Sequence, residues 1–317
     1  MISVNFFGTH DFAAGILQAL IDSADFEIKT VFTVPDKPIG RHQEIQKSSV
    51  KILAEKYGLR VEQPESLQNF SLLLTPYSLN IVCDYGLLIP KNIIDAPGHG
   101  SLNVHPSLLP KYRGATPVQT ALMNGDSETG VTIMLMDEKL DHGPILAWKT
   151  IKIDPTDNYT SLSEKLLETA KSLLIDTVQK WVLGPKMPPQ PQDDSKATVC
   201  HELTRADGQV DFSGQTAQQV YNRFRALTPW PGVWTMLGGK RVKLLSVITA
   251  MPTGRQAKAG ICGRSRVKPG MTAIADNQIF FTCADGNPIE VLELQMEGKK
   301  PMTAKEFING YKTLLHA

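Results

Sequence analysis

Residues 101–117 read SLNVHPSLLPKYRGATP, and residues 140–143 read LDHG. Asn103 and His105 are two positions apart, so on an extended strand their side chains lie on the same face. The small, turn-prone run after His105 lets a ligand approach the backbone closely, and Asp141 could orient the imidazole. An amide donor, an imidazole and a carboxylate together suit the transfer of an acyl group.

Length and composition predict a globular protein with two domains. A chain of 317 residues is longer than a domain with a single hydrophobic core usually is. Its 42% hydrophobic and 21% charged residues are typical of soluble proteins. No apolar run approaches the roughly 18 residues that cross a bilayer, and the N-terminus lacks the basic segment of a signal peptide. We therefore expect a cytoplasmic protein that does not bind membranes.

The cysteines predict neither a disulfide framework nor a metal site. They are scattered and form no C-x-x-C pair, which favours reduced thiols of a cytoplasmic protein over zinc ligands. They are Cys83, Cys200, Cys262 and Cys283. We expect no bound metal.

The first half of the chain alternates apolar runs with helical patterns, which predicts an α/β domain. The expected strands are 3–7, 30–33, 60–62, 79–83, 102–104, 130–136 and 145–153, and the expected helices are 12–21, 48–57, 117–123 and 161–182. Strands separated by helices imply a parallel doubly wound, Rossmann-like sheet. In such a sheet ligands bind beyond the carboxyl ends of the strands, which is where His105 falls.

The second half of the chain predicts a separate β domain. Residues 184–194, GPKMPPQPQDD, indicate a proline-rich extended linker. Beyond it we expect helices at 217–227 and 304–315 and short strands at 233–236, 241–247, 260–262, 273–275, 278–282 and 289–294. Short strands with Gly- and Pro-bearing turns favour an open, OB-like β-barrel. The predicted division is a catalytic domain (1–183), a linker (184–200) and a C-terminal OB-like domain (201–317).

The charge distribution sets the C-terminal part apart, although the net charge is only +1. No acidic residue lies between Asp211 and Asp276, whereas the same span carries many cations. They are Arg223, Arg225, Lys240, Arg241, Lys243, Arg255, Lys258, Arg264, Arg266 and Lys268. Such segregation suits a polyanion such as a nucleic acid, and a solvated basic face is the alternative of equal weight.

The first strand–helix connection argues against a dinucleotide site. Its sequence, FGTHDFA at 7–13, has the single glycine Gly8 where a pyrophosphate site needs G-x-G-x-x-G. No P-loop is present either, so redox chemistry and phosphoryl transfer are disfavoured.

The stretch from Asn103 to Gly143 resembles the folate-dependent formyltransferase family, and the resemblance extends over the whole chain. Further shared motifs are FGTHDFA (7–13), PDKPIGR (35–41) and YGLLIP (85–90). Two C-terminal motifs, RALTPWPG (225–232) and LQMEGKKPM (294–302), resemble specifically those members that act on an aminoacyl-tRNA.

The resemblance implies transfer of the formyl group of 10-formyltetrahydrofolate, a co-substrate, to the α-amino group of initiator methionyl-tRNA. The family's catalytic residues fall on Asn103, His105 and Asp141. The amide of Asn103 and a protonated His105 would donate to the formyl oxyanion. Asp141 would favour and orient the imidazolium and accept the proton of the attacking amine.

The resemblance also implies the binding residues. Folate would lie against two loops made of Tyr85, Gly86, Leu87 and Leu88, and of Ser107, Leu108, Leu109 and Pro110. The tRNA would contact Arg41, Lys47, Arg264 and Arg266. Gln43 and Glu44 replace the family's usual lysine pair, which weakens phosphate attraction in the loop 35–49. We expect a monomer.

Three alternatives stay open from the sequence. A formyltransferase acting on the amine of a nucleotide-linked sugar would share the Asn, His and Asp set but should lack the basic C-terminal domain. A hydrolase that removes formyl from the same folate would not need that domain. A catalytically silent RNA-binding protein would not need the intact Asn103, His105 and Asp141.

Overall fold

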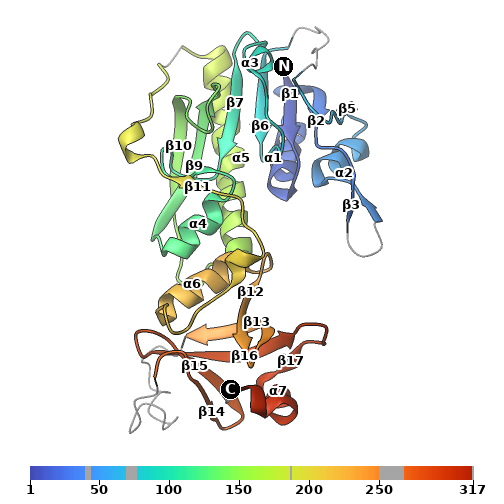
Figure 1. Cartoon of the computed structure of the whole chain (residues 1–317). Helices are drawn as coiled ribbons and strands as arrows, with labels where there is room; N and C mark the ends of the chain where they lie inside the picture. The colour runs from blue at the N-terminus through green and yellow to red at the C-terminus, as the bar shows by residue number, and fades with distance from the viewer. Residues whose placement is uncertain (40–43, 69–76, 186–187, 250–267, 316–317) are drawn as a thin grey trace. The chain divides into compact units, whose positions relative to one another are not determined.

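The computed structural model describes residues 1–39, 44–68, 77–185, 188–249 and 268–315 (Figure 1). The chain forms two compact units. Unit 1 comprises 1–117, 127–154 and 160–201, and unit 2 comprises 118–126, 155–159 and 202–317. The proline-rich stretch expected to be a linker is thus part of unit 1. No helix in the described part of the chain is long and apolar enough to cross a membrane.

Unit 1 is built on a seven-stranded sheet with the order β10-β9-β7-β6-β1-β2-β5. The strands are β1 (Ile2–Gly8), β2 (Phe26–Phe32), β5 (Val61–Glu62), β6 (Leu79–Cys83), β7 (Ser101–His105), β9 (Glu128–Leu135) and β10 (Ile145–Lys152). The five strands β1, β2, β5, β6 and β7 run parallel, whereas β9 is antiparallel to β7 and β10 is antiparallel to β9.

The predicted Rossmann-like class is therefore confirmed, but the sheet is mixed rather than parallel throughout. Residues 136–144 join β9 to β10 directly. A parallel connection needs a crossover of a dozen or more residues, so this short link can only return the chain antiparallel. The mixed edge matters because it brings the 136–144 loop back beside β7.

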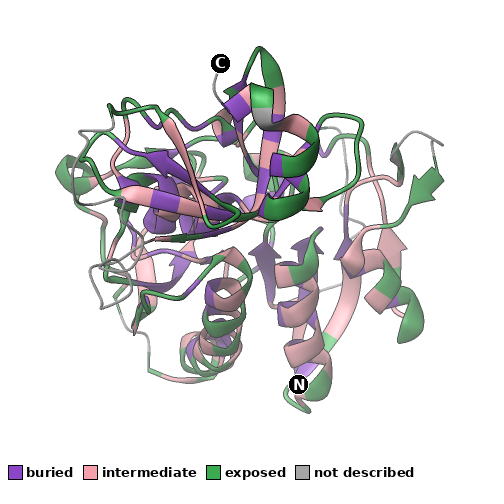
Figure 2. Cartoon of the chain, turned by 90° about the horizontal axis from the view of Figure 1, so that it is seen from below, coloured by how far each residue is buried: buried purple, intermediate pink, exposed green. Residues whose placement is uncertain are grey.

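Helices cover the sheet of unit 1, and their buried stripes follow the helical period. They are α1 (Asp11–Asp22), α2 (Ser49–Lys56), α3 (Lys91–Ile94) and α5 (Tyr159–Leu183). In α1, Ala13, Ile16, Leu17 and Leu20 are fully buried at the i, i+3, i+4 and i+7 spacing. Figure 2 shows the same division, with buried strands and helices whose outer faces are exposed.

Two small pairs of strands complete unit 1. One is formed by β3 (Lys37–Ile39) and β4 (Glu44–Gln46), and the other by β8 (Arg113–Gly114) and β11 (Val199–Cys200). The 3-10 helix η1 (Asp194–Lys196) precedes β11. Residues 190–201 thus run along unit 1, pairing first with Ile145 and then with β8.

Unit 2 is an antiparallel sheet with helices packed on it. The sheet order is β12-β13-β16-β15-β14, and β17 pairs with β16. Its strands are β12 (Val233–Leu237), β13 (Lys240–Thr249), β14 (Thr272–Ala275), β15 (Gln278–Thr282), β16 (Pro288–Met296) and β17 (Met302–Thr303). Its helices are α4 (Pro117–Asn124, from residue 118 onward), η2 (Ala206–Gly208), α6 (Ala217–Leu227), α7 (Ala304–Tyr311) and η4 (Lys312–Leu315).

The expected β-barrel is an open sheet in the described part of unit 2, with β12 and β14 at its edges. The strand expected at 260–262, with Cys262, lies outside the described residues. Helix α6 begins where the sequence predicts, because Thr216 and Gln219 form a reciprocal capping box. The C-terminal helix expected to reach 315 ends at Tyr311 and continues as a 3-10 turn.

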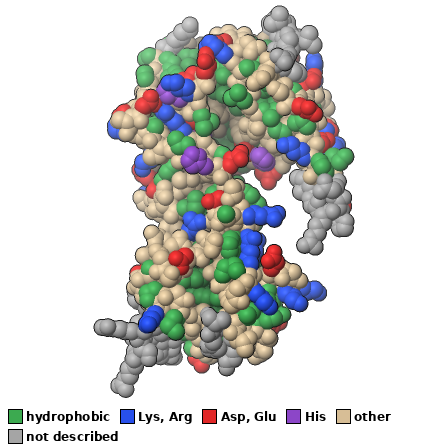
Figure 3. Space-filling view, viewed as in Figure 1, with side chains coloured by type: hydrophobic (Ala, Val, Ile, Leu, Met, Phe, Trp, Pro, Cys, Tyr) green, Lys and Arg blue, Asp and Glu red, His purple; other side chains and the backbone are tan. Residues whose placement is uncertain are grey.

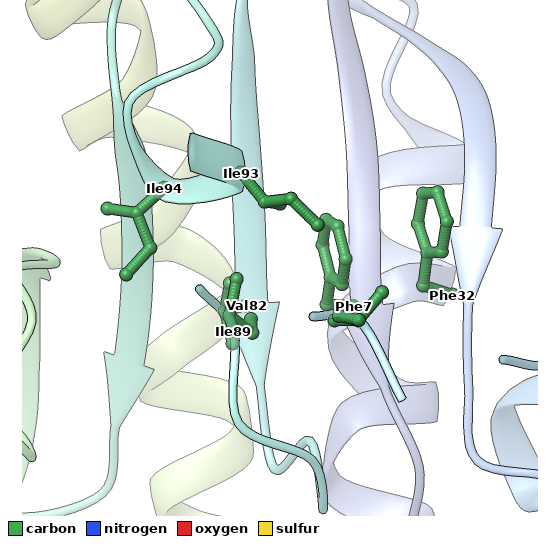
Figure 4. Close-up of a cluster of buried hydrophobic side chains, with 7 residues drawn as sticks. Phe7, Phe32, Val82, Ile89, Ile93 and Ile94 are labelled. Atoms are coloured by element: carbon green, nitrogen blue, oxygen red, sulfur yellow. The ribbon is translucent and has the colours of Figure 1, made fainter. Parts of the chain in front are cut away.

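A compact aromatic and aliphatic cluster joins buried side chains of the neighbouring strands β1, β2 and β6 with those of α3 (Figure 4). Phe7 stacks on Phe32 with ring centroids 4.4 Å apart, and Tyr85 packs edge-on against Phe7. The other buried members are Leu67, Val82, Ile89, Ile93 and Ile94. This cluster fixes the residues that follow β1 and β6, at the carboxyl edge where His105 ends β7.

Candidate active site

The end of β7 carries the two polar residues singled out in the sequence. β7 is a central strand, paired with β6 on one side and β9 on the other, and all five of its residues are buried. Asn103 is opposite Val82 on β6, and His105 is opposite Thr132 on β9. Burial leaves these side chains about 9% and 4% exposed, so their polar atoms need partners inside the protein.

The Asp141 carboxylate brings the site together. Its Oδ1 accepts a hydrogen bond from Nδ2 of Asn103 at 3.0 Å, and its Oδ2 accepts one from the backbone N–H of Gly114 at 2.8 Å. The same Oδ2 lies 3.6 Å from Nδ1 of His105. Asn103 and His105 of β7 and Gly114 of β8 thus meet the distant Asp141, so the three residues Asn103, His105 and Asp141 lie together as expected.

The contacts of His105 decide which ring nitrogen can do chemistry. Nε2 lies 2.8 Å from the carbonyl oxygen of Tyr112. A carbonyl oxygen only accepts, so Nε2 must carry a proton and donate it. Nδ1, on the other side of the ring, lies 3.6 Å from Oδ2 of Asp141.

The loops around this carboxylate have a strained backbone at Asp141 and Tyr112 and a close contact between Gly114 and Cys200. Asp141 and Tyr112 adopt the left-handed region, with φ of 46° and 61°. Each non-glycine residue held there costs about 1–3 kcal/mol unless its surroundings compensate. Gly114 has φ of 117°, and a Cβ there would lie 2.2 Å from the carbonyl oxygen of Cys200, so only glycine fits between β8 and β11.

The loop after β7 is tied down by hydrogen bonds to β9. The Ser107 hydroxyl, which is fully buried, donates to the Lys111 carbonyl oxygen at 2.6 Å. The Thr132 hydroxyl donates to the Ser107 carbonyl oxygen at 2.7 Å and accepts from the N–H of Leu109 at 3.2 Å. The expected folate loop is therefore a rigid turn beside His105, with Leu108 and Pro110 half-buried.

The second expected folate segment follows β6. Tyr85 and Leu87 are half-buried, Gly86 is exposed, and Leu88 is 75% exposed. Burial raises the pKa of Tyr85 to about 12, and its hydroxyl meets no hydrogen-bond partner among the described residues. The preceding Asp84 bonds His10 at 3.0 Å, and this hydrogen bond raises the pKa of His10.

The expected RNA-contacting cations are only partly described. Arg41, Arg264 and Arg266 lie outside the described residues. Lys47 is described, and its ammonium pairs with Glu55 at 2.7 Å. In unit 2, Arg241 stacks over the ring of Trp234, 4.2 Å from the centroid. Figure 3 shows Lys and Arg side chains gathered on one face of unit 2.

Sequence reasoning missed Gln192, which lies in the stretch expected to be a linker. Its Nε2 donates to the backbone oxygens of Asp141 and Gly143 at 2.9 and 2.8 Å, and its Oε1 accepts from the Arg113 guanidinium. Asp194 binds the same guanidinium at 2.8 Å, and this hydrogen bond lowers the pKa of Asp194. A glutamine among prolines carries no signal for such contacts, because they depend on where the segment folds back.

Comparison with known proteins identifies the class. The profile of the formyl transferase family matches residues 1–178, and the profile of the formyl transferase C-terminal domain matches residues 202–312. The chain belongs to the formyl transferase family. The fold agrees with this assignment.

Curated relatives make the likeness more specific. The chain is 40% identical to the methionyl-tRNA formyltransferase of Acidobacterium capsulatum, covering 96% of this chain and 95% of the relative. It is 41% identical to the methionyl-tRNA formyltransferase of Caldicellulosiruptor saccharolyticus, covering 98% and 97%.

Solved structures share the fold at low identity. HypX from Aquifex aeolicus in complex with tetrahydrofolic acid matches 98% of this chain with a TM-score of 0.63 and 17% identity, and this chain spans about half (48%) of HypX. An N-formyltransferase from Helicobacter canadensis, in complex with folinic acid and dTDP-3-aminofucose, matches 93% of this chain and all (100%) of its own, with a TM-score of 0.64 and 16% identity.

The assignment of the proton to Nε2 of His105 can be tested directly. Because Nε2 donates to the Tyr112 carbonyl oxygen, we expect nitrogen-15 NMR of the neutral imidazole to give the Nε2–H tautomer, with a slowly exchanging ring proton. The His105→Gln variant identifies the signal by its loss. An Nδ1–H tautomer would contradict the geometry.

Proposed function

We propose that this protein transfers the formyl group of 10-formyltetrahydrofolate to the α-amino group of initiator methionyl-tRNA, giving N-formylmethionyl-tRNA for translation initiation. The observation that carries the proposal is the buried cluster in which Asn103 and Gly114 hold Asp141 beside His105. The near-full-length likeness to methionyl-tRNA formyltransferases supports this acceptor.

The proposed chemistry is direct attack of the amine on the formyl carbon. A new C–N bond forms, and the formyl oxygen becomes an oxyanion. Nδ2 of Asn103 has a second N–H besides the one given to Asp141, and we assign this proton as a donor to the oxyanion. One such donor is typically worth about 3–4 kcal/mol of barrier.

His105 and Asp141 handle the charge and the proton. With Nε2–H committed to Tyr112, Nδ1 is the ring nitrogen on the side of Asp141, and the Asp141 carboxylate 3.6 Å away would stabilise an imidazolium by its charge. Asp141 accepts the proton leaving the amine, directly or through water. When the tetrahedral intermediate collapses, the bond from carbon to the folate nitrogen breaks, and that nitrogen takes up the proton that Asp141 received from the amine, which restores the carboxylate.

The two loops beside this cluster are proposed to bind the folate. The loop from Ser107 to Pro110 is held rigidly against β9, which suits a surface that must fix the formyl donor. The segment from Tyr85 to Leu88 offers exposed apolar surface and a buried phenol without a partner among the described residues.

The tRNA is proposed to contact Arg41, Lys47, Arg264 and Arg266, with the basic face of unit 2 adding attraction for phosphates. We further propose that the protein acts as a monomer in the cytoplasm. The buried thiols of Cys83, Cys200 and Cys283 are consistent with a reducing compartment.

Transfer to a nucleotide-linked sugar is the alternative that a specific observation favours, because a sugar-bound N-formyltransferase shares the fold. That likeness is at 16% identity, whereas the tRNA enzymes match at about 40% over both units. The acid-poor C-terminal stretch also favours a polyanionic acceptor.

Purified protein given 10-formyltetrahydrofolate and charged initiator methionyl-tRNA is expected to produce N-formylmethionyl-tRNA. The His105→Ala variant should lose transfer and keep nearly the wild-type affinity for tRNA, because the imidazole is buried and acts on the reacting group. Absence of product where a known enzyme succeeds would contradict the proposal, and an equal loss of affinity would make His105 structural.

Charge reversal at Arg264 and Arg266 tests the C-terminal contacts. The double variant Arg264→Glu, Arg266→Glu should bind tRNA more weakly, and the slope of log affinity against log salt should fall by about 2, near 0.9 per lost phosphate contact. Filter binding across a salt series measures this. Lys171→Glu on α5 is the matched control and should leave the slope unchanged. Unaltered binding of the double variant at low salt would contradict the assignment.

A further inference from the structure

The segment 190–201 forms a strap across the active-site loops. Its backbone pairs with Ile145 through Gln190 and with β8 through Val199 and Cys200. The side chain of Thr198 accepts from the N–H of Tyr112 at 2.9 Å. The strap therefore touches both the strand after the Asp141 loop and the residue whose carbonyl oxygen binds His105.

Two strap side chains contact both loops: Asp194 pairs with Arg113 and lies 3.4 Å from His142, whereas Gln192 also binds the backbone of the Asp141 loop directly. Its amide nitrogen binds the two carbonyl oxygens of the Asp141 loop, at Asp141 and Gly143. Its amide oxygen binds Nε and an Nη of Arg113 at 3.1 and 2.8 Å. A single side chain thus uses both of its donors and its acceptor to join two loops.

Arg113 lies between the two backbone groups that hold the catalytic cluster. The preceding residue, Tyr112, gives its carbonyl oxygen to His105, and the following residue, Gly114, gives its N–H to Asp141. Tyr112 and Asp141 are both in the left-handed region, so each loop holds a conformation that it would readily leave without support.

We propose that Gln192 is a positioning residue for formyl transfer, because its side chain joins the loop that carries Asp141 to the loop that binds His105. This role rests on the proposed function. Gln192 has no direct part in the chemistry; it keeps the Asp141 carboxylate between Gly114 and His105. If the Asp141 carboxylate moves from this position, the reacting groups are no longer correctly aligned. A displacement near 1 Å can lower a rate about a hundredfold.

Two variants test the role. Gln192→Glu keeps the acceptor for Arg113 and replaces the donor by an acceptor that repels the carbonyl oxygens of Asp141 and Gly143. Gln192→Met removes every polar contact without adding charge, so a folding failure of one variant leaves the other to measure. Gln190→Glu is the matched control, since Gln190 is exposed on the same strap and pairs through its main chain.

The first measurement needs no activity. Amide hydrogen exchange of Gly114, whose N–H binds Asp141, should accelerate by about tenfold or more in the Gln192 variants, because the local opening becomes easier. Exchange in β1 and the melting temperature should stay as in the wild type and in Gln190→Glu. Unchanged protection at Gly114 would overturn the role of Gln192.

The second measurement is steady-state formyl transfer. We expect kcat to fall about 10- to 100-fold in the Gln192 variants, with KM for the folate and for the tRNA within a factor of about two. An unchanged kcat, or an equal fall in Gln190→Glu, would overturn the proposal. A wild-type enzyme that binds both substrates but transfers no formyl group would instead overturn the proposed function, while exchange at Gly114 still decides whether Gln192 joins the loops.

Discussion

The hydrogen bonds to the Asp141 carboxylate are the interaction on which the site depends. A buried carboxylate is stable only when its oxygens are paired, and here Asn103 and Gly114 donate hydrogen bonds to them while His105 lies 3.6 Å away. Asn103 and His105 belong to β7 and Gly114 to β8, so the carboxylate links β7, β8 and the loop between β9 and β10. The groups that hold Asp141 in place are also those assigned to the proposed reaction.

The mixed sheet makes this convergence possible. The parallel strands β1, β6 and β7 end at the same edge of the sheet. The cluster around Phe7, at the ends of β1 and β6, therefore lies near the end of β7. The antiparallel run of β9 along β7, with its short return into β10, brings the 136–144 loop and Asp141 back to β7, where Asp141 binds Asn103. A fully parallel sheet would have needed a helical crossover between those strands, and Asp141 could not have followed β9 so closely.

Much of this arrangement could be predicted from the sequence. Alternating apolar runs indicated the strands and helices of unit 1, and the two-residue spacing placed Asn103 and His105 on one face. The direction of β9 and β10 was missed because an apolar run does not encode whether its neighbour is parallel. Gln192 was missed because proline-rich composition indicates an extended backbone but not the surface along which it lies. The tautomer of His105 depends on one carbonyl oxygen, which no pattern of side chains reveals.

The most direct test of the central claim is the single-turnover rate of formyl transfer by Asp141→Asn with both substrates saturating. This substitution keeps the size of the side chain and removes its charge. We predict that the rate of the chemical step falls by about two to four powers of ten while tRNA affinity is retained, since the imidazolium loses its counter-ion. A rate within a factor of about two of the wild type would contradict the account, because the carboxylate would then be only structural.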